Sequence, residues 1–128
     1  MGGYLLDTHA AIWFFNGDRQ LSETAKNIIR NHSNPVYLSI ASAWEVAIKL
    51  SIGKLDIDGK TADFIQDVEI NKITIIPIEI AHLNVFETLP LIHRDPFDRM
   101  LVATAICEQM TIITADENIA RYDVSHIW

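Results

Sequence analysis

The sequence predicts an α/β protein, a three-layer α/β/α sandwich around a mostly parallel central sheet of four to five strands. Short continuous apolar runs, typical of strands buried on both faces, alternate along the chain with segments whose apolar residues recur at helical spacing. The chain has 128 residues, of which 49% are hydrophobic, enough to bury one compact core. We therefore expect a single domain over residues 1–128, with helices on both faces of the sheet.

The first strand is expected at residues 4–6, an apolar run that ends at Asp7, where the first helix begins. Residues 16–18, Asn-Gly-Asp, have the composition of a turn. Ser22 is then a favourable N-cap for a second helix that ends near His32.

The second strand is expected at residues 36–38 and leads into a helix over residues 39–50, which either Ser39 or Ser42 opens. Gly53 suits the position just after the end of that helix. An apolar stripe at helical spacing predicts the buried face of the helix: Ile40, Ala43, Trp44, Ala47, Ile48 and Leu50.

The second half of the chain continues the alternation of helix and strand. A helix capped by Thr61 is expected up to Ile70, and Pro90 stops a later helix over residues 79–89. A third strand is expected within residues 73–78, a long helix at residues 95–106 and a fourth strand at residues 111–114. A short helical turn at residues 116–121 and a last strand at residues 124–128 follow.

The composition excludes some classes of function. A net charge of −7 argues against binding nucleic acid through a broad basic surface, although an acidic site can hold RNA through bridging cations. No apolar run approaches the roughly 20 residues of a membrane span, and the first residues lack the basic region of a signal peptide. The lone Cys107 cannot form an internal disulfide. We expect a cytoplasmic protein with no membrane partner.

Four carboxylates stand where a strand passes into a helix, or on a helix beside such a point: Asp7, Glu45, Asp98 and Asp116. Sites in parallel sheets form at the carboxyl ends of strands, and Asp7 and Asp116 follow the first and fourth strands. A buried acid is costly without a counter-charge, so four converging acids would bind a divalent cation strongly. The alternative is that Asp7 and Asp116 are only helix caps.

The other two acids also have a structural alternative. Glu45 lies at the edge of the apolar stripe, where an i,i+4 ion pair with Lys49 accounts for it equally well; Lys49 could instead tune the acid or meet a phosphate. Asp95 at the N-cap, Pro96 at the first helical position and Asp98 in the first turn make a favourable helix start. We assign Asp95 mainly to the cap and Asp98 mainly to the site.

Four stretches together resemble the PIN-domain family, most closely the VapC-type toxins of bacterial and archaeal toxin–antitoxin pairs. They occur in the family's order over nearly the whole chain: LLDTH at residues 5–9, SAWEVAIK at 42–49, HRDPFDR at 93–99 and ITAD at 113–116. The segment at 93–99 is the most specific of these matches.

The resemblance implies a single PIN-like nuclease domain over residues 1–128, a metal-dependent endoribonuclease that cleaves RNA by attack of water and leaves a 5′-phosphate and a 3′-hydroxyl. It implies that Asp7, Glu45, Asp98 and Asp116 hold Mg²⁺ or Mn²⁺, with Glu117 as an alternative fourth acid. It also implies a homodimer inhibited by a cognate VapB-type antitoxin.

Five residues are expected to support the acids or the substrate. The family suggests that the hydroxyls of Thr8 and Thr114 orient the acids, beside Asp95 and Lys49. Arg99 could bind a substrate phosphate or pair with a nearby acid, as could Arg94, while His9 and His93 are expected to be exposed or to belong to a helix start.

Two other functions remain open. A receiver-like Mg²⁺-binding phosphoacceptor domain needs an Asp that ends the middle strand and a Lys after the last one, whereas the third strand here ends in Ile76-Pro77. A non-catalytic binding module would use the same acids to receive a basic partner.

Overall fold

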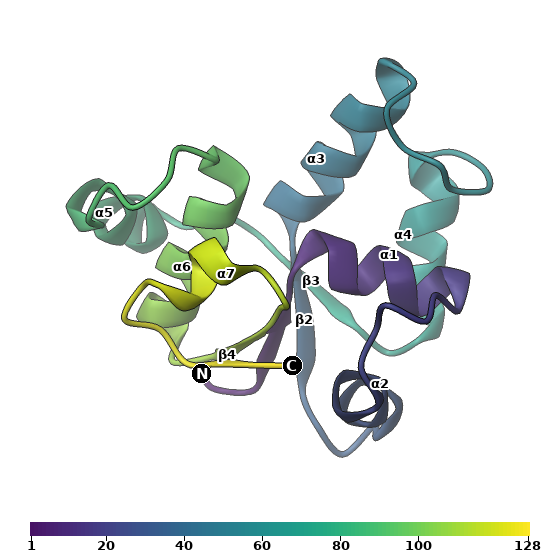
Figure 1. Cartoon of the computed structure of the whole chain (residues 1–128), viewed down its shortest axis with the longest axis horizontal. Helices are drawn as coiled ribbons and strands as arrows, with labels where there is room; N and C mark the ends of the chain where they lie inside the picture. Colours follow the sequence, from purple (N-terminus) through teal and green to yellow (C-terminus); the bar gives the residue numbers. More distant parts are fainter.

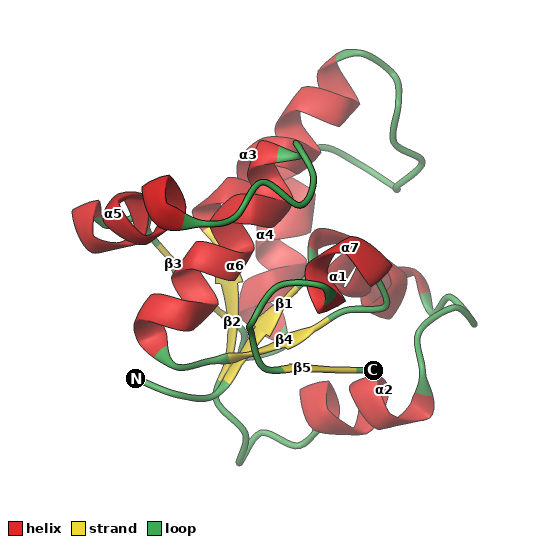
Figure 2. Ribbon diagram, turned by 60° about the vertical axis from the view of Figure 1, so that its left-hand side comes forward, coloured by secondary structure: helices red, strands yellow, loops and turns green.

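A central sheet of five parallel strands lies between two layers of helices (Figures 1 and 2). The computed structural model describes residues 1–128. The strands are β1 Tyr4–Leu6, β2 Val36–Ser39, β3 Thr74–Ile76, β4 Thr111–Ile113 and β5 His126–Ile127. The helices are α1 Thr8–Asn16, α2 Glu23–Arg30, α3 Ile40–Ser51, α4 Thr61–Ile70, α5 Ile80–Thr88, α6 Pro96–Glu108 and α7 Glu117–Ala120. The predicted fold class is confirmed, and the sheet is parallel throughout.

Two hydrophobic clusters fill the spaces between the layers. Leu6 belongs to the cluster that packs under α1, α2 and α4, whereas its neighbour Leu5 belongs to the cluster that packs under α6 and α7. Both side chains are fully buried, because successive residues of a strand point to opposite faces. The strands are therefore apolar at successive positions, which is why they read as continuous apolar runs.

The order of the strands is β3-β2-β1-β4-β5. The chain therefore builds outward from β1 in one direction through β2 and β3, and in the other through β4 and β5. Ligands of open α/β sheets bind outside the carboxyl ends of the strands at such a reversal. Receiver-type domains have the order 2-1-3-4-5, so the receiver-like alternative does not fit this topology.

The buried face of α3 differs from the predicted one. Trp44 is 61% exposed and Ile40 is 43% exposed, whereas Glu45 is only 5% exposed. Val46 and the small side chains of Ala41 and Ser42 pack inward instead. The prediction is confirmed for Ala43, which is 5% exposed, and is wrong for Ile40 and Trp44, because helical spacing identifies an apolar stripe without saying which part of it faces the sheet.

Most other boundaries agree with the prediction to within about two residues. Ser39 rather than Ser42 opens α3, because its hydroxyl accepts the backbone N–H of Ala41. Thr61 is not a cap: Lys60 precedes the first turn of α4, and its own N–H donates to Asp63. No helix combines the length and the apolar character that a membrane span requires.

Candidate metal centre

Asp7 lies at the carboxyl end of β1, in the middle of the sheet. Its carboxylate accepts the backbone N–H of His9 at 3.3 Å, as an N-cap of α1, and the hydroxyl of Thr114 at 2.7 Å. Only 5% of the residue is exposed. Burial raises the pKa of this carboxyl, and the charge of Asp116 raises it further, although the two hydrogen bonds act in the opposite direction. Asp7 is therefore a cap and a buried acid at the same time.

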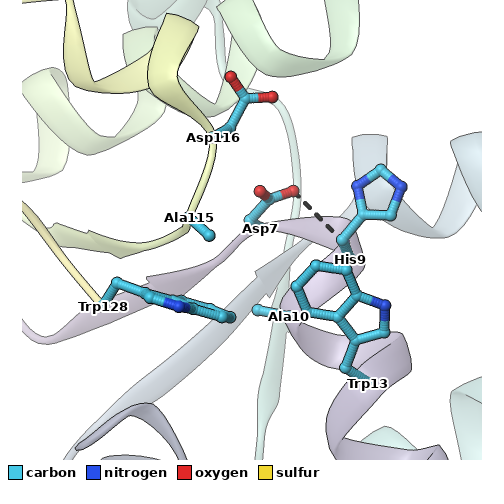
Figure 3. A pocket seen from close by; sticks show the side chains of 7 residues that line it. All are labelled: Asp7, His9, Ala10, Trp13, Ala115, Asp116 and Trp128. Atoms are coloured by element: carbon cyan, nitrogen blue, oxygen red, sulfur yellow. Dashed lines mark hydrogen bonds between the residues drawn. The ribbon is translucent and has the colours of Figure 1, made fainter. Parts of the chain in front are cut away.

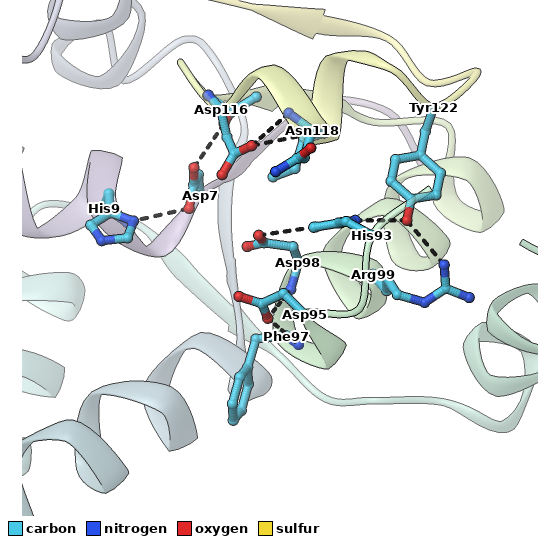
Figure 4. Close-up of polar contacts among 12 residues, drawn as sticks. Asp7, His9, His93, Asp95, Phe97, Asp98, Arg99, Asp116, Asn118 and Tyr122 are labelled. Atoms are coloured by element: carbon cyan, nitrogen blue, oxygen red, sulfur yellow. Dashed lines mark hydrogen bonds and ion pairs between the residues drawn. The ribbon is translucent and has the colours of Figure 1, made fainter. Parts of the chain in front are cut away.

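The raised pKa of Asp98 indicates that the acids lie close together. Its pKa is raised to about 8, first by burial and then by the charges of neighbouring carboxylates. The carboxylates that raise it are Asp95, Asp7, Asp116 and Glu45. Coulombic interaction falls with distance and is screened by water, so these groups act on Asp98 only because the fold brings them together. Figure 4 shows Asp7, Asp95, Asp98 and Asp116 around one space, contributed by three different segments.

Glu45 enters the cluster from α3. Its side chain is 7% exposed, and one oxygen lies 2.9 Å from the ammonium of Lys49, which is 34% exposed. The predicted i,i+4 ion pair is therefore present. It does not remove Glu45 from the site, because the charge of Glu45 still contributes to the raised pKa of Asp98. Lys49 supplies the counter-charge that makes a buried glutamate tolerable.

Asp116 completes the group from the segment after β4. It caps α7 by accepting the N–H of Asn118 at 2.7 Å and that of Ile119 at 3.4 Å. Its own N–H donates to the Thr114 hydroxyl at 3.0 Å, and that hydroxyl in turn donates to Asp7. Thr114 thus ties two of the acids together. Glu117 is exposed and is absent from the charges that raise the pKa of Asp7 and Asp98, so Asp116 is the acid that faces the cluster.

Of two supporting residues, Thr8 lies differently from the prediction and Asp95 lies as predicted. The Thr8 hydroxyl donates to Ser42 at 2.8 Å and so joins α1 to α3, rather than orienting a carboxylate. Asp95 caps α6 as expected, because one carboxylate oxygen accepts the N–H groups of Phe97 at 2.9 Å and Asp98 at 3.1 Å.

Arg99 neither faces solvent nor pairs with an acid. It is 8% exposed, and its guanidinium donates to the carbonyl of Pro90 at 2.9 Å and to the Tyr122 hydroxyl at 3.0 Å. The expectation that Arg99 binds a substrate phosphate or an acid is wrong, because α6 turns this side chain inward, over the ring of Phe86. Arg94 is exposed.

His93 was expected to be exposed or to belong to a helix start, but its side chain is only 13% exposed and contacts the site. Its Nδ1 lies 2.8 Å from the Tyr122 hydroxyl, and its Nε2 lies 3.3 Å from Asp98 (Figure 4). Arginine can only donate, so the Tyr122 oxygen accepts from Arg99 and donates its proton to Nδ1. Nε2 then carries the ring proton and donates it to Asp98. The only sequence feature that could have indicated this role is the closeness of His93 to Asp98 along the chain. No local pattern could have identified Tyr122 as the hydrogen-bond partner of His93, because the two residues are distant in the sequence.

A second group of potential ligands lies away from this cluster, where α5 packs on α6: His82, Cys107 and Glu108. The Nδ1 of His82 accepts the N–H of Glu79 at 3.0 Å, so the neutral ring carries its proton on Nε2. That nitrogen is 3.8 Å from Glu108 and has no hydrogen-bond partner. A metal would need the same nitrogen unprotonated, so this group does not fit a metal site.

Comparison with known proteins agrees with this architecture. No curated protein sequence matches the chain significantly. Among solved structures, the chain is similar to VapBC2 from Rickettsia felis bound to a fragment of promoter DNA, with a TM-score of 0.72, 16% identity and coverage of 99% of this chain and 98% of that one. It is similar to FitAcB from Neisseria gonorrhoeae, with a TM-score of 0.65, 19% identity and coverage of 98% and 96%.

A third similar structure is the DNA-bound VapBC from Salmonella typhimurium, with a TM-score of 0.69, 15% identity and coverage of 100% of this chain and 98% of that one. At these identities the likeness concerns the fold. The sequence model of the PIN domain matches residues 4–125, which is nearly the whole chain. The chain therefore belongs to the PIN-domain family.

Proposed function

We propose that this protein is a metal-dependent endoribonuclease of the VapC type, a toxin that cleaves RNA phosphodiester bonds by attack of water. The observation that carries the proposal is the convergence of the acids: Asp7, Asp98 and Asp116 surround one space (Figure 4), and burial and four neighbouring carboxylates raise the pKa of Asp98 to about 8. Such a cluster of like charges is unfavourable by itself and becomes favourable when a divalent cation is bound. Membership of a family of nucleases makes phosphodiester hydrolysis the chemistry to test.

The donor set fits Mg²⁺ or Mn²⁺. Asp7, Glu45, Asp98 and Asp116 offer only carboxylate oxygens, which are the ligands that hard divalent cations prefer. When bound, such a cation neutralises charge on the attacked phosphate and acidifies a water molecule that attacks it. We propose these four residues as the metal ligands and the catalytic acids.

The surrounding residues hold the acids in place. Thr114 donates to Asp7 and accepts from the backbone of Asp116, which fixes the acids after β1 and β4 relative to each other. The hydrogen bond from His93 fixes the orientation of Asp98, and the positive charge of Lys49 compensates the negative charge of Glu45. Attack of water in line with the leaving 3′-oxygen would give a 5′-phosphate and a 3′-hydroxyl.

The proposed partner is a VapB-type antitoxin that inhibits the enzyme. The support is that structures similar to this chain are described as VapBC proteins and as a toxin–antitoxin complex from Klebsiella pneumoniae. An acidic cluster suits a basic segment of such a partner. The expected result is that co-expression with the antitoxin relieves growth inhibition and abolishes RNA cleavage by the purified complex.

The decisive experiment measures cleavage of RNA by the purified protein with Mg²⁺ or Mn²⁺. We expect activity that EDTA abolishes and that returns when metal is added. Asp7→Asn and Asp98→Asn should lower the rate at least about 10–100-fold, the range found even for groups that only support metal ligands. Asp56→Asn, which changes an exposed acid outside the cluster, is the matched control.

The same assay tests the competing function. If no RNA is cleaved, while a basic antitoxin binds the wild type tightly and Asp7→Asn weakly, the chain is a non-catalytic acidic binding module. Cleavage that survives in Asp7→Asn and Asp98→Asn at the wild-type rate would come from a contaminant and would overturn the assignment of the acids.

A further inference from the structure

We propose that a pocket beside the acids binds one unpaired base of the RNA, next to the phosphate that is cleaved; this inference rests on the proposed ribonuclease function. The pocket is a cavity of about 210 Å³ at the carboxyl end of the sheet (Figure 3). Its lining residues come from both ends of the chain: Asp7, His9, Ala10, Trp13, Ala115, Asp116 and Trp128.

The position of the pocket makes it part of the substrate path. Asp7 and Asp116 belong both to its lining and to the acidic cluster. A ligand in the pocket is therefore adjacent to the carboxylates proposed to hold the metal. In a nucleic acid a nucleoside is attached to the reacting phosphate. A phosphate held by the acidic cluster therefore places a nucleoside beside this pocket.

The aromatic residues that line the pocket favour binding of a nucleoside base. The rings of Trp13 and Trp128 lie 5.8 Å apart between centroids at an angle of 66°, and those of His9 and Trp13 lie 5.8 Å apart at 43°. These tilted arrangements mean that the rings do not stack face to face on one another. Unpaired bases stack on aromatic side chains in proteins that bind single strands, and the contact tolerates different bases because each has a π face.

The size and the charge of the pocket also favour a single nucleic-acid base as the ligand. A volume of about 210 Å³ lies below the roughly 300–1,000 Å³ of sites for drug-sized ligands, which suits one ring system rather than a base pair. Asp7 and Asp116 in the wall repel a bare phosphate and leave a neutral ring unaffected. Without a bound cation, the size and the charge of the pocket therefore favour a single unpaired base over a phosphate group.

Tryptophan fluorescence tests the pocket without catalysis. In the Trp44→Phe variant, Trp13 and Trp128 are the only remaining tryptophans. We expect the neutral nucleosides adenosine and cytidine, added in EDTA, to quench this fluorescence saturably. Trp128→Leu on that background should weaken the apparent affinity about tenfold, within the range that one stacked base contributes. Trp128→Phe should restore most of it, because a ring is again present.

The controls separate the pocket from the fold and from the chemistry. Circular dichroism should show that each variant is folded, and Trp44→Leu alone should leave the quenching intact. With RNA as substrate, Trp128→Leu should raise KM more than it lowers kcat. The absence of saturable quenching, or equal quenching in Trp128→Leu and Trp128→Phe, would overturn the base pocket.

Two further outcomes keep this inference apart from the proposed function. If nucleosides quench normally but no RNA is cleaved with metal present, the base pocket stands and the nuclease assignment fails. If RNA is cleaved without any nucleoside binding, only the pocket fails. Quenching by an arginine-containing peptide but not by nucleosides would assign the pocket to a protein partner and overturn the proposal.

Discussion

Asp98 is the residue in which burial and charge are most clearly in conflict. It stands in the first turn of α6, accepts a hydrogen bond from Nε2 of His93, and lies close to the charges of four other acids. A single proton near neutral pH relieves that repulsion, which is the physical content of a pKa of about 8. A bound cation would relieve it in the same way and would displace the proton.

This conflict predicts how stability depends on pH. The pKa of Asp98 is about 8 in the folded protein and near the ordinary 3.8 when unfolded. Between these values the folded state holds a proton that the unfolded state has released, so the free energy of unfolding falls as pH rises from about 4 to about 8. Thermal unfolding in EDTA should show this slope, and Asp98→Asn should reduce it and be more stable than wild type at pH 8.

Adding Mg²⁺ should reverse part of that loss at pH 8 in the wild type and much less in Asp98→Asn. A free energy of unfolding that rises over this pH range in EDTA would contradict the buried, protonated state of Asp98.

Tyr122 determines the tautomer of His93. Its hydroxyl accepts from Arg99 and donates to His93, so Tyr122→Phe leaves the Nδ1 of His93 without its partner and removes one of the two hydrogen bonds of Arg99, which still donates to the carbonyl of Pro90. We expect a loss of about 1–3 kcal/mol in the free energy of unfolding, the usual cost of buried groups left unsatisfied. Urea denaturation measures it. Tyr4→Phe is the control, because the Tyr4 hydroxyl makes no hydrogen bond within the protein, and it should change stability by much less.

At the scale of elements, the start of α6 serves both folding and the site. Asp95 caps the helix through two backbone N–H groups, and Pro96 occupies the first helical position. After burial, the charge of the same carboxylate makes the largest contribution to the raised pKa of Asp98. A single turn of helix therefore stabilises the fold and increases the repulsion that a cation would relieve.

Two substitutions of Asp95 separate these effects. Asp95→Ala removes the cap and should cost about 1 kcal/mol, the usual value for an N-cap. Asp95→Asn keeps a capping oxygen and removes a like charge, so at pH 7 in EDTA it should be at least as stable as wild type. It should also lower the pKa of Asp98, seen as a shift of the pH-dependent loss of stability to lower pH. Equal destabilisation by both variants would show that the charge of Asp95 does not act on Asp98.

At the scale of the whole molecule, the strand order decides where the site lies. Asp7 and Asp116 follow β1 and β4, which are neighbours in the sheet although they are distant in the chain. α3 and α6 then add Glu45 and Asp98 above the same end of the sheet. The sheet therefore works as a scaffold that brings acids from four segments to one point.

The homodimer that the family resemblance implies requires an exposed apolar surface. The side chains of Trp13, Phe14 and Phe15 pack against the core, whereas Ile52 is 61% exposed. A groove of about 310 Å³ between α3, α5 and α6 is almost entirely apolar. Its lining residues are Ala41, Trp44, Ile78, Leu83, Phe86, Pro96, Phe97 and Met100.

In this groove Trp44 is 61% and Leu83 is 49% exposed, so it can be tested as the surface that a second copy of the chain would cover in the expected homodimer. Leu83→Glu should then convert the protein from dimer to monomer in light scattering, because a charge would be buried at the interface. Ile52→Glu, at an exposed site outside the groove, is the control. A Leu83→Glu variant that remains dimeric but no longer binds the antitoxin would assign the groove to the antitoxin instead.

Local patterns of residues were sufficient to predict most of the helices and strands. Strands such as Tyr4–Leu6 and caps such as Asp95 depend on neighbouring residues, so local spacing was sufficient to predict them. Asp7 and Asp116 were recognisable because they follow apolar strands, whereas the resemblance to the PIN-domain family was needed to assign Glu45 and Asp98 to the same ligand set. The buried side of α3 was not predictable, since Glu45 and Trp44 are adjacent and only packing shows which one turns inward.

Tertiary structure alone decided which of these groups meet. The contacts of Thr114 with Asp7, of Tyr122 with His93, and of Trp128 with Trp13 join distant parts of the chain. No local pattern encodes such pairs, because they follow from strand order and from the packing of helices on the sheet. For the same reason the raised pKa of Asp98 belongs to the folded molecule: it arises from burial and from charges that are neighbours only in space.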